Sequence, residues 1–366
     1  MAGKSKRGSS AKNSSSGQVS KKRKIGKDEE EESTKKIDCE TKEKFHENMK
    51  KALRMEMPDD FFEFYEFCKS FGASHVHDAL SELLGLQLCG PYDLLHEELS
   101  LDTGTKGLVQ AESSGNMKYH LNSRFYFDPP EVMTVVRESS HQTGLHLGYF
   151  RDSPNELPSL VVSNRSEEDC VFTQCGDNIF AAVCNYAGDL LKSTKNKAKK
   201  EKIEVLLVSL KEFAQKYNHS LQLVTVKTQK RSKMVVAKTF HKMGLVVPLD
   251  GSGVGYRPLN LADNALRKVL TKICKAKNED EKNKCYDDLH ELITFVQFAN
   301  DECDYGMGLE LGIDLFCFGN EAFKQQVLQL LPLAYSLLGR ELYAEIIEKH
   351  MQNREKPFVD QVIEET

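Results

Sequence analysis

The 366-residue sequence contains no long uninterrupted run of apolar residues. A membrane-spanning helix needs roughly 20 such residues. The most apolar stretch, from Val327 to Leu338, is interrupted by Gln329 and Pro332. The N-terminus also lacks the apolar segment of a secretory signal peptide. We therefore expect neither a membrane protein nor a secreted one.

Several familiar catalytic and metal-binding motifs are incomplete. The string from Asp301 to Asp304 resembles the acidic motif of nucleic-acid helicases, but no phosphate-binding loop accompanies it. Its acids do not alternate as the calcium ligands of an EF-hand do. Neither the Cys170–Cys175 pair nor the His75–His77 pair has a partner pair at zinc spacing. We therefore expect no metal ion.

The glycine-rich run 251–255 also lacks its usual context. Tyr256, Arg257 and Pro258 follow it, where a dinucleotide-binding site would have a helix. The run is typical of a turn that presents Tyr256 and Arg257. Arg257 is then either part of an ordinary surface ion pair or a bidentate contact to a carboxylate or phosphate of a partner. No cofactor is expected to bind this chain.

The chain has many charged residues, and only their sum is close to zero. The formal net charge is -5, but residues 1–36 carry +6 and the remainder carries −11. The basic run Lys21, Lys22, Arg23, Lys24 is typical of a nuclear localisation signal. Residues 1–37 have no apolar periodicity, which predicts a disordered tail. Loose contacts of this tail with DNA or RNA stay open. The 10 cysteines are scattered, which is typical of reduced, mostly buried thiols.

Hydrophobic periodicity predicts an α+β fold with a helical N-terminal part, a central, mainly antiparallel sheet and a helical C-terminal part. The expected domains are 38–250 and 251–366. Pro58-Asp59-Asp60 begins a helix with an aromatic face, and 101–117 is expected to be a loop. β-branched or aromatic runs separated by turn residues predict the strands. These runs are 124–127, 132–136, 145–151, 160–163, 170–173, 221–226 and 245–248.

The C-terminal part concentrates the negative charge. Residues 278–314 hold 11 acids and two bases. A helix from Tyr286 to Ala299 would bury Leu289, Leu292, Ile293, Val296 and Ala299. It leads into three acids within four residues, Asp301, Glu302 and Asp304, followed by glycines that allow tight turns or close backbone approach. The cluster is either a solvated helix end or a carboxylate presented for acid–base chemistry or docking.

This acidic segment carries a family resemblance. The run 295–312, FVQFANDECDYGMGLELG, closely resembles the histone PARylation factor family. Shorter stretches match it as well, and the resemblance covers roughly residues 45–360. These stretches are 86–88, 90–93, 128–131, 148–154, 244–248, 331–335 and 344–348.

The resemblance implies a specific function. Members of this family bind the catalytic domain of DNA-damage-activated poly(ADP-ribose) polymerases and redirect ADP-ribose transfer to serine, notably on histones. By the match, Glu302 is the general base for the substrate serine. Asp301, Asp304, Tyr256 and Arg257 contact the partner, which holds NAD⁺. The resemblance further implies a nuclear location, in chromatin at sites of DNA damage.

One position departs from the family pattern. The family has a histidine where this chain has Glu321, so any contact made by that histidine is in doubt.

Two other functions stay open. The chain is alternatively a non-catalytic adaptor that binds chromatin or the polymerase. A stand-alone hydrolase or transferase is a weaker alternative, which turnover without a partner would support.

Overall fold

The computed structural model describes residues 45–71, 75–102 and 119–354. Contacts between Cα atoms group the chain from Met49 onwards into one compact unit, to which the description below refers. The basic run Lys21–Lys24 and most of the predicted loop 101–117 lie outside the described residues. The division at residue 250 stays a prediction. No helix in the described part of the chain is long and apolar enough to cross a membrane.

The described elements confirm the α+β class, because helices precede and follow a single antiparallel sheet. The N-terminal elements are α2 (Asp59–Ser70), η1 (Val76–Asp78), α3 (Ser81–Leu84), β1 (Leu86–Leu88), α4 (Pro91–Asp102) and η3 (Tyr119–Leu121). The central ones are β2 (Val132–Glu138), β3 (Leu145–Phe150), β4 (Leu160–Arg165), β5 (Thr173–Gly176), α5 (Ile179–Ser193), α6 (Lys197–Lys216) and α7 (Val226–Met234). The C-terminal ones are α8 (Asp263–Lys275), α9 (Glu279–Asp301), α10 (Gly306–Phe318), η4 (Glu321–Phe323), α11 (Lys324–Leu337) and α12 (Glu341–Gln352).

The sheet is a meander in the order β1-β2-β3-β4-β5, and every neighbouring pair is antiparallel. Val132 lies opposite Phe150 in the β2–β3 pair. The register of this pair shifts between Thr134 and Val136, where β2 has one extra residue. This meander confirms the predicted strands 132–136, 145–151 and 160–163.

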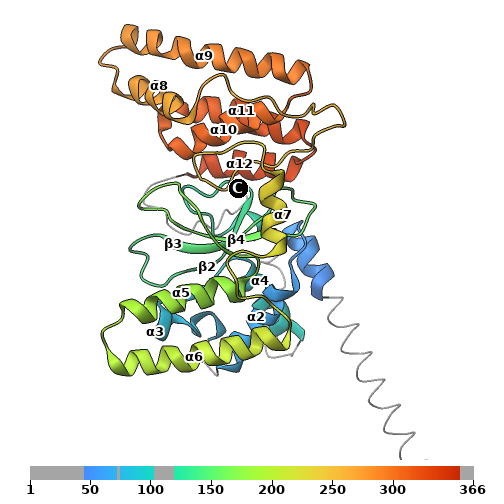
Figure 1. Cartoon of the computed structure of the whole chain (residues 1–366), viewed down its shortest axis with the longest axis vertical. Coiled ribbons are helices and arrows are strands. Elements are labelled where there is room, and N and C mark those ends of the chain that lie inside the picture. The colour runs from blue at the N-terminus through green and yellow to red at the C-terminus, as the bar shows by residue number, and fades with distance from the viewer. Residues whose placement is uncertain (1–44, 72–74, 103–118, 355–366) are drawn as a thin grey trace, which may run out of the picture. The chain divides into compact units, whose positions relative to one another are not determined.

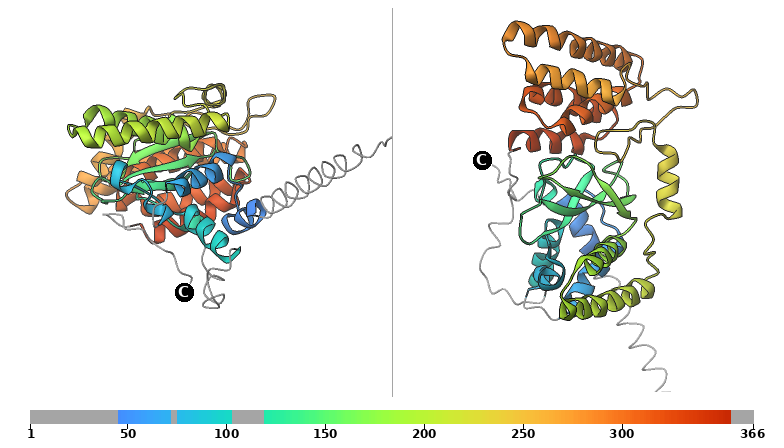
Figure 2. Two further views of the ribbon diagram at one scale, coloured as in Figure 1. Left: turned by 90° about the horizontal axis from the view of Figure 1, so that it is seen from below. Right: turned by 60° about the vertical axis from the view of Figure 1, so that its left-hand side comes forward.

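Helices lie on both sides of the sheet within this unit (Figures 1 and 2). On one side, the buried carboxylate of Asp60 in α2 accepts hydrogen bonds at 2.7 Å from the Tyr149 hydroxyl of β3 and the Ile179 N–H of α5. On the other, the Tyr335 hydroxyl of α11 donates to Glu131 at 2.9 Å. Buried polar groups need such partners, so these bonds fix how the helices sit on the sheet.

The two strands predicted after α6 are wrong. Residues 221–226 lead into α7, because the Thr225 and Thr228 side chains form reciprocal capping hydrogen bonds that start a helix. Residues 245–248 contribute only one isolated bridge, between Leu245 and Ala237. Gly244 precedes it at φ +72°, a left-handed conformation that interrupts extended pairing.

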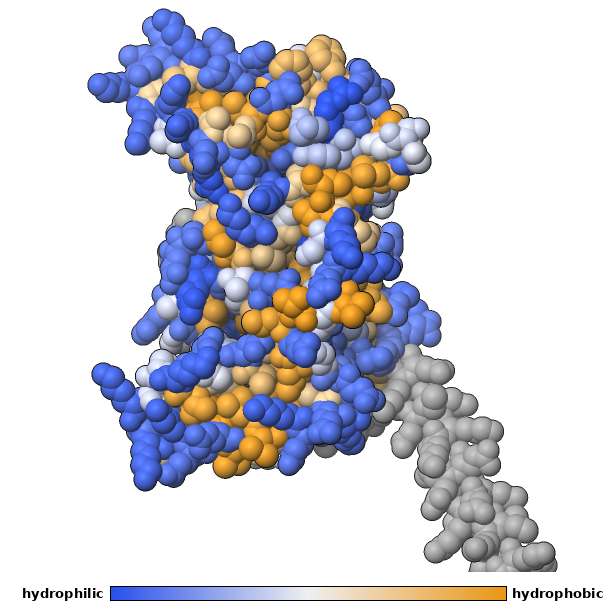
Figure 3. Space-filling view, viewed as in Figure 1, coloured by the Kyte–Doolittle hydropathy of each residue, from blue (hydrophilic) through white to orange (hydrophobic). Residues whose placement is uncertain are grey.

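A third predicted strand is wrong, and a fourth is shifted. Residues 124–127 form no strand, because the Asp128 carboxylate accepts the Phe125 N–H at 3.0 Å and closes a buried turn. The last strand begins at Thr173, where the sequence predicts a strand from 170 to 173. The sequence did not anticipate β1 and α4. The face in Figure 3 is a mosaic of hydrophilic and hydrophobic side chains.

Candidate functional site at the α9–α10 turn

Helix α9 delivers the acidic segment to the surface. It begins after Asn278, whose side chain accepts the Glu281 N–H at 2.8 Å. The five residues predicted to face the core are all buried, which confirms the predicted helix face. The helix ends at Asp301, so Glu302 is the first residue beyond the last helical turn.

A tight turn joins α9 to α10. The Asp304 N–H donates to the Ala299 carbonyl at 2.8 Å, and the Cys303 N–H donates to the Asn300 carbonyl at 3.1 Å. This pair of bonds defines a Schellman motif, whose left-handed position is usually glycine. Here Cys303 occupies it with φ +66°. A non-glycine residue in this region costs about 1 kcal/mol or more. The backbone is therefore strained directly beside Glu302.

The glycines after the turn act through close packing. Gly306 and Gly312 lie inside α10. A Cβ atom on Gly306 would lie 3.0 Å from the Gly255 carbonyl oxygen, and one on Gly312 would lie 2.5 Å from Leu331. The sequence suggests either tight turns or close backbone approach for these glycines. At Gly306 and Gly312 the structure shows close approach.

The turn 251–255 lies against the start of α10. Its main chain is held by the Asp250 carboxylate, which accepts the Ser252 and Val254 N–H groups at 2.8 and 2.9 Å. The Gly306 N–H donates to the Gly255 carbonyl at 2.9 Å. The Gly255 N–H in turn donates to the Asp304 carboxylate at 2.9 Å. These bonds bring Tyr256 and Arg257 beside the acidic turn.

Arg257 forms an ion pair with Glu302. Its Nη2 atom also lies 3.0 Å from Oδ2 of Asp304. The Arg257 side chain is 42% exposed and that of Glu302 is 60% exposed. Because both side chains are exposed to water, solvent screens the pair and its contribution to stability is small. A partner that binds either group can therefore break it at little cost.

The predicted site residues differ in exposure. Asp301 and Glu302 are exposed, whereas Asp304 is buried and already bonded within the chain. Tyr256 is partly buried and donates its hydroxyl hydrogen to Glu310 at 3.0 Å. Of these residues, Glu302 presents the most accessible carboxylate next to a cation. It is suited to accept a proton from a hydroxyl group brought to the surface.

Two acids counted in the negative segment do not belong to its surface. Glu310 and Asp314 are buried in α10, and Asp314 is only 1% exposed. Burial raises the pKa of Glu310 to about 7 and the pKa of Asp314 to about 8. Asp314 accepts the Phe240 N–H at 2.8 Å, so it ties α10 to the segment before the glycine turn. Counting acids in the sequence does not reveal that these two carboxyl groups are buried and structural.

The buried acids predict a pH dependence of stability. With raised pKa values, the folded chain binds more protons than the unfolded chain between about pH 4 and pH 8. Their stabilisation is complete at the low end of this window and is lost as the pH rises through 7 and 8. The change is up to about 1.4 kcal/mol per pH unit and group. Chemical denaturation at several pH values measures it.

The matched variants for this experiment are Asp314→Asn and Asp287→Asn. The first keeps an oxygen that can accept the Phe240 N–H, and we expect it to flatten the pH profile. The second changes an exposed acid of α9 and should leave the profile unchanged. An Asp314→Asn profile as steep as that of the unaltered chain would contradict the assignment.

Glu321 lies at the other end of α10 from Glu302. It is exposed at the start of η4, and its carboxylate lies 3.9 Å from the Lys324 amine. The Asn320 side chain caps this turn by accepting the Ala322 N–H at 3.0 Å. An acid here leaves the turn intact, but it reverses the charge that a protonated histidine would bring.

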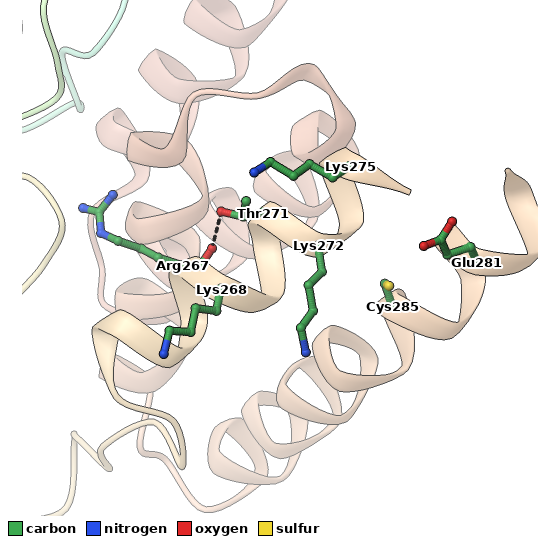
Figure 4. Close-up of a pocket in the computed structure, with 7 residues that line it drawn as sticks. All are labelled: Arg267, Lys268, Thr271, Lys272, Lys275, Glu281 and Cys285. Carbon is green, nitrogen blue, oxygen red and sulfur yellow. Dashed lines mark hydrogen bonds between the residues drawn. The ribbon is translucent and has the colours of Figure 1, made fainter. Parts of the chain in front are cut away.

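A separate groove of about 560 Å³ lies between α8 and α9 (Figure 4). It is lined by Arg267, Lys268, Thr271, Lys272, Lys275, Glu281 and Cys285. The Arg267 guanidinium lies 3.6 Å from the centre of the Phe240 ring and is engaged there. In Figure 4 Lys268 and Lys272 point toward the lower part of the view, whereas Lys275 points to the left. The groove therefore has no convergent set of polar groups like that at Glu302.

Comparisons with known proteins extend over most of the chain. The family model described as Histone PARylation factor 1 matches residues 42–354. The chain is 44% identical over 309 residues to Histone PARylation factor 1 of Bos taurus, which covers 84% of this chain and 86% of the bovine protein. The Mus musculus protein of the same name is 43% identical over 312 residues, or 84% and 86% of the two chains. The Danio rerio protein is 41% identical over 320 residues, or 87% and 88%.

Proposed function

Because this chain belongs to the Histone PARylation factor 1 family, we propose that it is an accessory factor for ADP-ribosylation of histones. It binds the catalytic domain of a DNA-damage-activated poly(ADP-ribose) polymerase, completes a composite active site and directs the modification to serine. The observation that carries this proposal is the exposed Glu302 carboxylate at the end of α9, held beside Arg257.

The chemistry explains why a serine acceptor needs this chain. A serine hydroxyl is a weak nucleophile unless a positioned base takes its proton. Glu302 accepts that proton while the serine oxygen forms a bond to the ADP-ribose unit. Nicotinamide is the leaving group, released from the NAD⁺ molecule that the partner holds. An aspartate or glutamate acceptor is already ionised and needs no base. The chain is thus not an enzyme alone but supplies one catalytic group.

The neighbours of Glu302 have two proposed roles. Asp301 is exposed and is available to a basic partner surface. Asp304 and Tyr256 shape the joint site from within, since both already bond inside the chain. Arg257 contacts the polymerase. When Arg257 turns to the polymerase it leaves Glu302, so docking and release of the base are coupled.

Replacing Arg257 tests the docking role. We expect Arg257→Ala to weaken binding to the isolated polymerase catalytic domain by roughly tenfold or more, because a charge-assisted contact is lost. Isothermal titration measures this. Lys268→Ala on α8 is the control, since it removes one exposed cation outside the α9–α10 turn. Equal affinities of Arg257→Ala and the unaltered chain would remove Arg257 from the interface.

A non-catalytic adaptor is the alternative function. In that case the exposed acids only dock to a cationic surface of the polymerase or of histones. The two functions differ in one assay, which modifies a histone peptide with the polymerase in the presence and absence of this chain and maps the modified residue. A shift of modification to serine supports the accessory factor. Unchanged acceptor residues support the adaptor.

Nuclear import belongs to the same proposal. The basic run Lys21–Lys24 directs the chain to the nucleus, where its proposed partners act on damaged chromatin. NAD⁺ is bound by the polymerase, and this chain contributes no cofactor. The negative charge around Asp301 and Glu302 is suited to the Lys/Arg-rich tails of histones that surround a target serine.

A further inference from the structure

A second charged region has the opposite sign to the α9–α10 turn. Residues 192–242 hold 14 Lys and Arg but only three Asp and Glu, a net charge of +11. They include α6, the following segment and α7. Because the whole chain carries -5, this region is a concentrated exception that the proposed function does not use.

Helix α7 displays this charge on its outer face. Lys227, Lys230 and Lys233 are exposed, whereas Thr228 and Arg231 on the opposite side are buried. Within the described part of the chain, none of the three lysines forms an ion pair. At about 1.5 Å per residue, this lysine row extends over about 9 Å. We call these three residues the α7 lysine row.

A buried arginine holds the row in place. The Arg231 guanidinium makes two hydrogen bonds to the Asp152 carboxylate, at 2.7 and 2.8 Å, and a third to the Met243 carbonyl at 2.8 Å. It also stacks over the Phe150 ring at 4.9 Å. A short helix with few apolar contacts is thereby fixed rigidly, with its lysines directed to solvent.

The row is electrostatically unfavourable in the chain alone. The first turn of α7 contains Lys227 but no acid. The first turn of α6 likewise contains no acid, and this helix begins with Lys197, Lys199 and Lys200. Cations near a helix N-terminus oppose the helix dipole, and neighbouring lysines repel one another. An anionic surface laid along α7 would relieve both effects in that helix.

The composition of the row distinguishes between anionic partners. Protein interfaces are enriched in aromatic residues and Arg and depleted of Lys. Helix α7 has no aromatic residue, and its one Arg is buried. Flexible lysine amines without aromatic neighbours are suited to phosphates, which they contact without reading bases. We propose that the α7 lysine row binds the phosphate backbone of duplex DNA, independently of base sequence.

This inference stands apart from the proposed function, because it uses neither Glu302 nor the α9–α10 turn. It also differs from any contact made by the basic run Lys21–Lys24. A DNA contact through α7 would add a second attachment point to chromatin beside the one through the polymerase.

The test measures binding of the full chain to a labelled duplex of about 20 base pairs by fluorescence anisotropy, at salt concentrations from about 50 to 200 mM. The variant replaces Lys227, Lys230 and Lys233 together by Gln. We expect its affinity to fall by roughly tenfold to a hundredfold. The slope of log affinity against log salt should become shallower by about 2.7, or 0.9 for each lost phosphate contact.

Two controls separate this surface from other sources of positive charge. Replacing Lys268, Lys272 and Lys275 of α8 by Gln removes the same charge from a different helix, where the three lysines line the groove with Glu281 (Figure 4). Replacing the basic run 21–24 by Gln tests the tail. We expect the α8 variant to bind as the unaltered chain does. The loss caused by the α7 variant should persist when the tail is also replaced. Circular dichroism confirms that each variant is folded.

Three results would overturn the proposal. The first is an absence of duplex binding at about 50 mM salt. The second is an α7 variant with the affinity and salt slope of the unaltered chain, or of the α8 control. The third is poly-glutamate displacing the duplex at equal charge concentration, which would identify an acidic protein surface as the partner.

Discussion

Replacing Glu302 by Gln is expected to reduce serine ADP-ribosylation by about 10²–10⁴-fold, the range that a positioned general base contributes. The amide has nearly the same shape and can still accept a hydrogen bond from Arg257, but it cannot take the serine proton at neutral pH. Binding to the polymerase catalytic domain is therefore expected to survive. Mass-spectrometric mapping of modified histone peptides measures the first effect, and titration measures the second.

Glu291→Gln is the matched control for this experiment. It neutralises an exposed acid within α9, for which the described part of the chain shows no ion pair with an arginine. We expect normal serine modification from this variant, because only the position of the carboxylate matters. Near-normal serine modification by Glu302→Gln would falsify the assignment of the base. Loss of both binding and modification would instead favour the adaptor.

Replacing Gly255 by Ala is expected to destabilise the fold by about 2–4 kcal/mol, as strain at a special backbone conformation does. Gly255 has φ +136°, which L side chains rarely adopt. Its Cβ atom would lie 2.2 Å from the Pro248 carbonyl oxygen, which is backbone and cannot rotate away. The same residue bonds Asp304 and Gly306. The change therefore also displaces Arg257 from Glu302.

Gly251→Ala provides the control within the same turn. A Cβ atom there meets nothing within 4 Å, so we expect a change of less than about 0.5 kcal/mol. Urea denaturation of the three proteins measures the difference. Equal midpoints for the Gly255 and Gly251 variants would show that the turn adjusts freely and does not fix Arg257.

The sequence predicts most reliably those elements whose periodicity is strong. The aromatic face of α2 and the buried face of α9 are present as expected, because a helix with one apolar side has only one way to bury it. The segments 221–226 and 245–248 have strand-like composition, but propensity alone does not provide a pairing partner. In such segments, contacts with the rest of the fold decide whether a strand forms.

The candidate site shows the same division. The residues from Asp301 to Asp304 stand out in the sequence as a dense acidic cluster. The burial of Glu310 and Asp314 cannot be recognised in the sequence. Helix α10 is apolar on nearly every side, so no periodicity separates these two residues from the exposed acids. The Arg257–Glu302 pair joins residues 45 positions apart, which no local pattern reveals.

The shared Arg257 nitrogen has a consequence for the order of events at the surface. Three acids and one arginine give this turn a formal local charge of −2, which becomes −3 when Arg257 leaves. The local potential near Glu302 thus becomes more negative when the pair opens. Under the proposed function, a cationic peptide is then expected to be attracted most strongly after the polymerase has engaged Arg257. The proposal therefore predicts that the polymerase binds first and the substrate second.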